Sequence, residues 1–329
     1  MSDGIDPNDV RIFSGRSHPG LAQGIANHLG LPLEPTNFSR FSNDNLYIQL
    51  CSSVRGRKIY IVQSLIPPVS DHLLELFMML DIARSAAARE VHAIVPYFSY
   101  ARSDKKNAPR ISITARLIAD LLQTAGATHF MTMTLHSPQV HGFFSIPADP
   151  LTARALFVSY IHDKGYGVDD TVVVAPDYGR AGSATRLASQ LGLNAIAAEK
   201  TRIADTEVRI GELITKQVSG FKRALIYDDE VATGGSVLKL SELLIESGVE
   251  EIVLICTHGL FIGDALKRIA EIPQITEIVT TDTVPIPPEK RLPNMTVLSV
   301  APLFGEAIRR NYLHQSIGDL FAFWQDIFE

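Results

Sequence analysis

A twenty-residue stretch occurs twice in this 329-residue chain, and this repeat limits the possible folds more than any other feature of the sequence. Residues 13–32 read F-S-G-R-S-H-P-G-L-A-Q-G-I-A-N-H-L-G-L-P, and residues 175–194 read A-P-D-Y-G-R-A-G-S-A-T-R-L-A-S-Q-L-G-L-N. Two later segments repeat as well: K-I-Y-I-V-Q-S-L matches A-L-I-Y-D-D-E, and V-H-A-I-V-P-Y matches I-V-L-I-C-T-H. The chain therefore reads as an internal duplication, in which one structural unit is present in two copies.

Short apolar runs alternate with helical patterns in each copy. In the first, the apolar runs predict strands and the segments between them predict helices; the expected strands are 10–13, 46–50, 58–63, 91–96 and 130–134, and the expected helices are 21–29, 73–88 and 112–124. Gly30 after the first helix is a C-cap signal, and Ser112 is the expected N-cap of the third. This alternation indicates an α/β fold with parallel central sheets. We expect two duplicated domains, 1–150 and 151–329.

Composition narrows the class of protein. Apolar residues make up 46% of the chain and charged residues 20%, which is typical of a soluble globular protein with a sizeable core. The net charge of −6 argues against nucleic acid as a partner. The two cysteines, Cys51 and Cys256, lie in apolar runs and suit a reducing compartment. No signal peptide and no apolar run of membrane-spanning length is visible, so we expect a cytoplasmic protein with no membrane partner.

The segment 223–236, R-A-L-I-Y-D-D-E-V-A-T-G-G-S, carries the clearest chemical signal. An apolar run at 224–227 predicts a buried strand that ends in Asp228 and Asp229. Thr233, Gly234, Gly235 and Ser236 then precede an amphipathic run at 237–245. A strand, a glycine-rich turn and a helix in this order form a site where backbone N–H groups can bind a phosphate.

The alternative interpretation is an exposed strand end followed by an ordinary turn, which short motifs often prove to be. The co-occurrence of strand, paired acids, glycines and helix favours the phosphate site. The segment is not a P-loop, because no lysine follows the second glycine. It resembles the phosphoribosyl-binding loop of the type I phosphoribosyltransferase fold, in which the acids hold the ribose hydroxyls and the turn holds the 5-phosphate. In the first copy, Q-S-L-I-P-P-V-S-D (63–71) stands in its place.

Nearly the whole chain resembles the ribose-phosphate pyrophosphokinase (phosphoribosyl pyrophosphate synthetase) family. The segments that carry the resemblance are V-R-G-R-K-I-Y-I-V-Q-S, P-Y-F-S-Y-A-R-S-D-K-K, L-H-S-P-Q-V-H-G-F-F-S-I-P-A-D, T-D-T-V-P-I and A-P-L-F-G-E-A-I-R-R. The resemblance implies transfer of the β,γ-pyrophosphoryl group of Mg-ATP to O1 of ribose 5-phosphate, which yields phosphoribosyl pyrophosphate and AMP. It also implies two phosphoribosyltransferase-like domains, with the ATP and assembly side in 1–150 and the ribose-5-phosphate loop in 151–329.

The resemblance also implies roles for individual residues. Lys200 and Arg202 would be the catalytic cations that close over the polyphosphate. The ATP-binding residues would be Phe41, Asn43, Asn45, Arg102, Ser103 and Asp104, and the ribose-5-phosphate-binding residues would be Asp228, Asp229, Ala232, Thr233, Gly234, Gly235 and Ser236. In the family, the loop equivalent to 41–45 completes the adenine site of a neighbouring subunit, so a dimer-based homo-oligomer, up to a hexamer, is expected.

His136 and Asp177 would hold the Mg²⁺ that accompanies ATP. Mg²⁺ prefers oxygen ligands, so the residue chemistry alone would make His136 a hydrogen-bonded residue at a strand end. The resemblance, and not the chemistry, places His136 at the metal.

The sequence departs from the family pattern at several positions. Thr134 and Ser145 stand where Asp is common, His141 and Ser103 where Gln is common, and Ala232 where Asp usually precedes T-G-G. Asn43 and Asn45 replace two acids of the adenine loop. Two alternatives therefore stay open: a non-catalytic paralogue that regulates active subunits, and a phosphoribosyltransferase that consumes phosphoribosyl pyrophosphate.

Overall fold

The computed structural model describes residues 4–197 and 217–321, which form two compact units. The first unit takes in the chain up to Thr152, the short segment Thr283–Pro285, and the described residues from Ser299 onward. The second unit consists of Ala153–Asp282 and Ile286–Leu298. The chain therefore crosses into the second unit and returns to the first.

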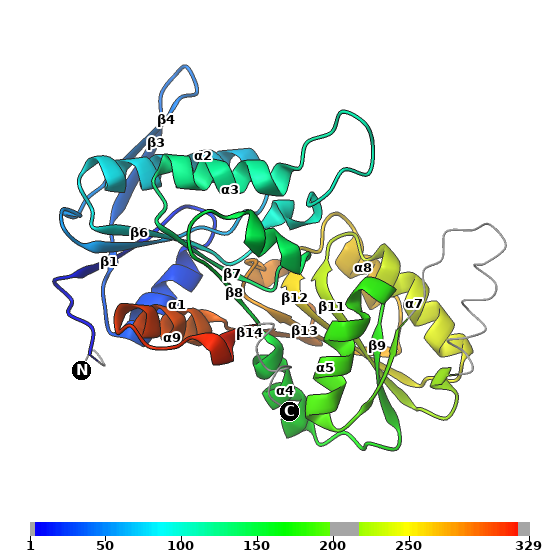
Figure 1. Cartoon of the computed structure of the whole chain (residues 1–329). Helices are drawn as coiled ribbons and strands as arrows, with labels where there is room; N and C mark the ends of the chain where they lie inside the picture. The colour runs from blue at the N-terminus through cyan, green and yellow to red at the C-terminus, as the bar shows by residue number, and fades with distance from the viewer. Residues whose placement is uncertain (1–3, 198–216, 322–329) are drawn as a thin grey trace. The chain divides into compact units, whose positions relative to one another are not determined.

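The first unit is built on a parallel sheet, which in the described residues has six strands in the order β2-β1-β5-β6-β7-β8 (Figure 1). Their bounds are β1 Val10–Ser14, β2 Leu33–Glu34, β5 Lys58–Val62, β6 Glu90–Val95, β7 His129–Met133 and β8 Ala148–Leu151. Almost every residue of β5, β6 and β7 is buried. Burial on both faces explains why these strands read as continuous apolar runs.

Helices cover both faces of this sheet. On one face, α2 (Val69–Ser85) and α3 (Thr114–Ala125) pack onto strand residues that include Phe13, Ile61 and Phe130. Figure 1 shows α1 (Pro19–Leu29) and α9 (Ala301–Tyr312) on the opposite face. The two lie very close, because a Cβ at Gly305 would come within 2.4 Å of the His28 ring.

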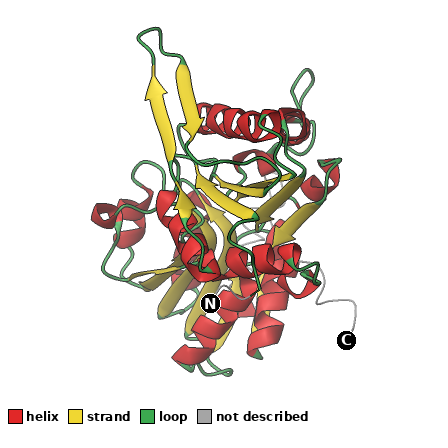
Figure 2. Cartoon of the chain, turned by 90° about the vertical axis from the view of Figure 1, so that its left-hand side faces the viewer, coloured by secondary structure: helices red, strands yellow, loops and turns green. Residues whose placement is uncertain are grey.

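A two-stranded antiparallel hairpin projects from the first unit (Figures 1 and 2). It consists of β3 (Thr36–Arg40) and β4 (Leu46–Leu50), and residues 41–45 form its tip. Ile48 faces inward and is buried, whereas Phe41 and Tyr47 are exposed. The hairpin is the main addition that the first unit makes to the repeated pattern.

The second unit repeats the same sheet, which in its described residues has six parallel strands in the order β10-β9-β11-β12-β13-β14. The strand bounds are β9 Thr171–Ala175, β10 Asn194–Ala197, β11 Arg223–Val231, β12 Glu251–Gly259, β13 Ile275–Thr281 and β14 Met295–Leu298. When the hairpin strands β3 and β4 are left out, each sheet has its second strand along the chain at one edge, followed by the first, third, fourth, fifth and sixth. An internal duplication predicts this shared order.

Four helices of the described part of the second unit cover its sheet. On one face, α7 (Gly235–Glu246) and α8 (Ala265–Ala270) pack onto apolar strand residues that include Val172, Ile226 and Leu254. On the other, Phe157 of α4 (Arg154–Lys164) meets Tyr227 edge-on at 6.0 Å between ring centres, and α5 (Ala181–Leu191) packs beside α4. The fold is therefore the α/β fold with two duplicated parallel sheets that the sequence predicts.

The N-cap of α3 was predicted wrongly. The helix α3 begins at Thr114, and Ser112 is not its N-cap. Instead, the Ser103 hydroxyl, eleven residues upstream, accepts the backbone N–H of Thr114 at 3.2 Å. Ser103 can reach the helix only because the intervening loop returns to it, a tertiary arrangement that a local sequence pattern does not contain.

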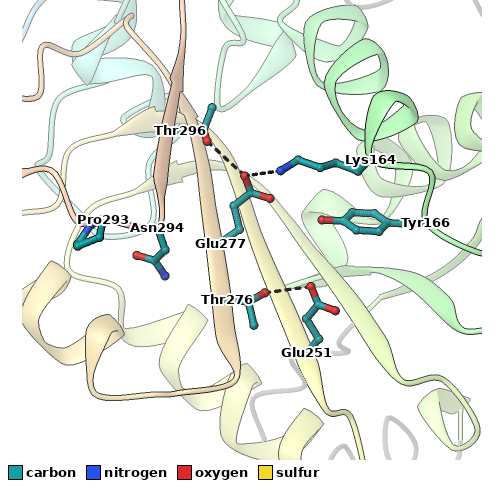
Figure 3. Close-up of a pocket in the computed structure, with 8 residues that line it drawn as sticks. All are labelled: Lys164, Tyr166, Glu251, Thr276, Glu277, Pro293, Asn294 and Thr296. Atoms are coloured by element: carbon teal, nitrogen blue, oxygen red, sulfur yellow. Dashed lines mark hydrogen bonds and ion pairs between the residues drawn. The ribbon is translucent and has the colours of Figure 1, made fainter.

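A network of polar side chains joins α4 to the sheet of the second unit. Oε1 of Glu277 accepts hydrogen bonds from Lys164 at 3.0 Å, from Thr296 at 3.2 Å and from the Tyr160 hydroxyl. Figure 3 shows Lys164, Glu277 and Thr296 at a pocket of about 350 Å³, where Thr276 also donates to Glu251 at 3.1 Å. Because these charged groups already bind one another, we assign the network a structural role.

Replacing Glu277 with alanine is expected to lower the free energy of unfolding by about 1–3 kcal/mol, because three polar groups lose their acceptor. Urea unfolding followed by circular dichroism measures this change. Glu271→Ala is the control, since Glu271 is exposed at the end of α8. Equal unfolding midpoints for the two variants would rule out the structural role of Glu277.

None of the helices among residues 4–197 and 217–321 combines the length and apolarity needed to span a bilayer.

Candidate functional site

The turn 232–236 of the second unit has the geometry of an anion site. Gly234 precedes α7 with φ 75°, a conformation that glycine adopts at little cost. Leu238 donates the first intrahelical hydrogen bond, to Gly234 at 2.9 Å. Among the described residues no side chain caps this helix, so its first N–H groups remain available to a ligand. Thr233 and Ser236 are exposed and add two hydroxyls.

The two aspartates lie inside β11, which continues to Val231 and is longer than the sequence predicts. On one side, β9 pairs with β11 only from Arg223 to Ile226, whereas on the other β12 pairs as far as Val231. Pairing with β12 thus extends the strand. Asp228 and Asp229 follow the point where β9 ends, at the carboxyl edge of the sheet where open α/β folds bind their ligands.

The paired carboxylates make this edge strongly polar. The Asp229 N–H donates to Oδ1 of Asp228 at 2.8 Å, and Asp229 is 5% exposed. Burial raises the pKa of Asp228 well above its usual range, and the neighbouring Asp229 carboxylate raises it further. Two poorly solvated acids side by side, Asp228 half-buried and Asp229 buried, favour a bound cation or ligand hydroxyl groups, which relieve their repulsion.

Arg180 joins two of the predicted site residues and was missed by the sequence analysis. Its guanidinium Nε lies 3.4 Å from Oδ1 of Asp229, and its backbone N–H donates to Oδ1 of Asp177 at 3.1 Å. The arginine lies in the repeated segment, in A-P-D-Y-G-R, and this position offered the only sequence signal. Asp177, Arg180 and Asp229 thus form one cluster within the second unit.

The equivalent place in the first unit is filled by its own side chains. Gln63, which follows β5, accepts the N–H and hydroxyl of Ser17 and donates to Glu75 at 3.0 Å. A Cβ at Gly15 would lie 2.2 Å from the Gln63 carboxamide, so this amide packs directly on the backbone. Glu75 is fully buried and pairs with Arg16. Side chains of the first unit therefore occupy the place that corresponds to the aspartate pair of the second unit.

In the first unit, two segments predicted to bind ATP and metal are linked. The Ser137 hydroxyl donates to Asp104 at 2.7 Å, which joins the loop after η1 (Ser99–Arg102) to the residue that follows His136. Arg102 is exposed, and Ser103 caps α3 as described above. Arg102, Ser103 and Asp104 therefore lie beside the segment of His136.

Phe41, Asn43 and Asn45 lie at the exposed tip of the hairpin. Phe41 is 57% exposed and meets Tyr47 edge-on at 5.8 Å between ring centres. Within the turn, Oδ1 of Asn43 accepts the N–H of Asn45 at 3.3 Å. The Asn43 side chain is exposed.

The remaining predictions fall outside the described residues or on separate units. Lys200 and Arg202 lie outside the described residues. His136 belongs to the first unit and Asp177 to the second. Within the described ranges, no three His, Cys, Asp or Glu side chains group closely enough to hold a metal ion on their own. Mg²⁺ commonly binds through one or two carboxylates together with substrate phosphates and water, and Asp177 suits that mode.

Comparisons with known proteins agree with this fold. Residues 10–126 match the N-terminal domain of ribose phosphate pyrophosphokinase, and residues 213–322 match the phosphoribosyl synthetase-associated domain. The chain is 42% identical over 314 residues to the ribose-phosphate pyrophosphokinase of Deinococcus radiodurans. The alignment covers 94% of this chain and 97% of the Deinococcus protein. It is 41% identical over 313 residues to the ribose-phosphate pyrophosphokinase of Rhodopirellula baltica. That alignment covers 95% of this chain and 98% of the Rhodopirellula protein.

A solved structure agrees as well. The crystal structure of phosphoribosylpyrophosphate synthetase from Mycobacterium smegmatis matches with a TM-score of 0.85 at 35% identity, covering 93% of this chain and 99% of that one. Both domain descriptions, relatives matched end to end and this structural match point to the same group of proteins. The chain belongs to the ribose-phosphate pyrophosphokinase (phosphoribosyl pyrophosphate synthetase) family.

Proposed function

We propose that this enzyme transfers the β,γ-pyrophosphoryl group of ATP to O1 of ribose 5-phosphate, forming phosphoribosyl pyrophosphate and AMP. The observation that carries the proposal is the turn 232–236 at the uncapped start of α7, shortly after the half-buried Asp228 and the buried Asp229. The turn and helix N-terminus suit the 5-phosphate, and the carboxylates accept hydrogen bonds from ribose hydroxyls.

The assignment of the remaining residues follows the family. Asp177, with His136, is proposed to hold the Mg²⁺ that enters with ATP, and Arg102, Ser103 and Asp104 are proposed to bind the nucleotide. Bound Mg²⁺ neutralises charge on the phosphate oxygens. Lys200 and Arg202 are proposed to stabilise the transferring group, and residues 1–150 and 151–329 to form the ATP and ribose sides. We place the enzyme in the cytoplasm.

The direct test incubates the purified protein with Mg-ATP and ribose 5-phosphate and follows AMP and phosphoribosyl pyrophosphate by chromatography. Equal amounts of both products are expected, because one molecule of each forms per turnover. A regulatory paralogue would release no AMP. A phosphoribosyltransferase would instead consume added phosphoribosyl pyrophosphate in the presence of a base.

We expect this enzyme to discriminate ATP from GTP less sharply than its relatives do. A carboxylate at position 43 could only accept a hydrogen bond and would repel the guanine carbonyl, whereas Asn43 can donate one. Removing such a penalty of about 1–3 kcal/mol changes selectivity by roughly one to two orders of magnitude. We expect Asn43→Asp to raise the ratio of kcat/KM for ATP over GTP by that factor. If both proteins prefer ATP equally, the asparagine does not select the base.

We also propose a homo-oligomer assembled from dimers, up to a hexamer, in which the hairpin tip of one subunit completes the adenine site of its neighbour. The exposed aromatic rings of Phe41 and Tyr47 support this contact, since large apolar side chains cluster at interfaces. Sedimentation velocity is expected to show a dimer or larger species. A monomer with full activity at the same concentration would contradict the proposal.

A further inference from the structure

A row of three rings crosses one face of the sheet in the first unit. Tyr60 of β5 pairs in register with His92 of β6, and His92 pairs with His129 of β7. The Tyr60 and His92 rings stack at 4.3 Å between centres, and the two histidine rings lie 5.1 Å apart. Their neighbours Val91 and Ala93 belong to the core under α2 and α3, so the row points to the opposite face, where Figure 1 shows α1 and α9.

Asn311 of α9 binds both outer rings of this row. Its side-chain oxygen accepts the Tyr60 hydroxyl at 3.3 Å, and its amide nitrogen donates to Nδ1 of His129 at 3.4 Å. Since Nδ1 of His129 accepts, the ring proton is on Nε2, which donates to Asp149 of β8 at 2.6 Å. Both nitrogens of His129 are therefore satisfied in the neutral form. One side chain thus fastens α9 to the sheet on either side of His92.

His92, the middle ring, keeps one nitrogen unsatisfied. Its Nε2–H donates to the Glu90 carboxylate at 3.1 Å, and the residue is 1% exposed. A neutral imidazole carries one proton, so Nδ1 is an acceptor, and no donor among the described residues meets it. Burial, which penalises the charged ring, lowers the pKa of His92 below its ordinary value of 6.5.

The charged groups around His92 leave it as the group that responds to mild acid. Lys58 lies 3.2 Å from Glu90, and hydrogen bonds from His92 and Lys58 hold the pKa of Glu90 at about 2, so this carboxylate stays ionised in mild acid. The Glu90 charge raises the pKa of His92, but burial and the neighbouring His129 and Lys58 outweigh it. The other titratable groups on the surrounding elements have partners or are exposed: His129 with Asp149, Tyr60 with Asn311, Tyr312 with Lys58, Asp9 with Arg89, Glu306 with Arg309 and Arg310, and the exposed His28 of α1.

We propose that His92 makes the docking of α9 sensitive to pH, so that protonation of Nδ1 in mild acid releases this helix from the sheet. Protonated His92 would hold a buried charge and an N–H without an acceptor, which is costly, and opening α9 admits water to both. The chain after α9 returns to the end of β8, where Leu320 accepts the N–H of Thr152 at 3.0 Å. Acid should loosen this contact as well. The device uses none of the residues assigned to ATP or ribose 5-phosphate.

The test is hydrogen exchange followed by mass spectrometry at pH 7.5 and 5.5, corrected for the intrinsic exchange rate at each pH. If opening takes up one proton, the opening equilibrium rises by up to tenfold per pH unit below 6.5. Wild-type α9 is therefore expected to open about tenfold more at pH 5.5. The internal reference is α3, on the other face of the same sheet, which should open equally at both pH values.

Three variants make the result specific. His92→Phe keeps an aromatic ring in the row but cannot be protonated, and it is expected to remove the tenfold response. His92→Gln keeps a donor for Glu90, also lacks a titratable group, and is expected to behave in the same way. The matched control is His162→Phe, which replaces a histidine of α4 whose side chain is 84% exposed and should respond to acid as the wild type does.

The outcomes are distinct. Wild-type α9 that opens equally at both pH values overturns the inference. A tenfold response that persists in His92→Phe or His92→Gln belongs to another group and overturns it as well. Equal acid opening of α9 and α3 reports unfolding of the whole unit and contradicts local release. If one His92 variant does not fold, the other supplies the comparison.

Discussion

Replacement of Lys200 with alanine is expected to lower kcat by about 10²- to 10³-fold, or roughly 2.7–4 kcal/mol, the usual loss when one transition-state donor is removed. The transferring pyrophosphoryl group gains little from covalent catalysis, so positioned cations carry most of the rate. Ribose 5-phosphate binding should be unchanged, because the sugar is assigned to 228–236. Steady-state kinetics together with calorimetric titration of ribose 5-phosphate measures both effects.

The matched control is Lys222→Ala, which removes an exposed lysine from the same unit and should keep the wild-type rate. Arg202→Ala is expected to behave as Lys200→Ala does. If Lys200→Ala retained most of the wild-type kcat, the role assigned to this lysine would be wrong. A loss confined to ribose 5-phosphate binding would move Lys200 to the sugar site instead.

Gly235→Val should abolish most binding of ribose 5-phosphate while leaving the protein stable. A Cβ at Gly235 would find only the Thr233 hydroxyl, at 4.0 Å, and the residue does not need a positive φ. The side chain would therefore fit the protein but occupy the space in which a phosphate approaches the turn. Losing two hydrogen bonds to a charged group, at about 1.5–3 kcal/mol each, weakens binding by at least 100-fold.

Calorimetric titration and thermal unfolding together check this expectation. Gly20→Val is the control, because Gly20 lies in the first turn of α1, is exposed, and would bring a Cβ no closer than 3.9 Å to the His18 ring. The control should bind ribose 5-phosphate normally. Wild-type affinity in Gly235→Val would show that the phosphate binds elsewhere, whereas a large fall in Tm would mean that the turn is strained by the substitution.

Local signals predicted the framework of this protein. The repeated segment predicted two copies of one unit, and the two sheets have the same strand order. Gly30, which ends α1 at φ 65°, followed from a cap preference that depends on the backbone of one residue. The order of strand, acids, glycines and helix at 223–236 indicated the turn at α7. This signal is also local, because all of these residues are close together in the sequence.

Features that depend on distant partners appeared only in the tertiary structure. Ser112 looked like a helix cap, but Ser103 takes that role because its loop folds back onto α3. The strand β11 runs past its apolar segment because β12 continues to pair with it. Arg180 reads in sequence as one more polar residue of the repeat. Its contact with Asp229, 49 residues away, exists because β9 and β11 are adjacent in the sheet. Apolar periodicity and helix caps depend on residues that are close together in the sequence. The partner of a charged side chain depends instead on which strands lie side by side in the sheet.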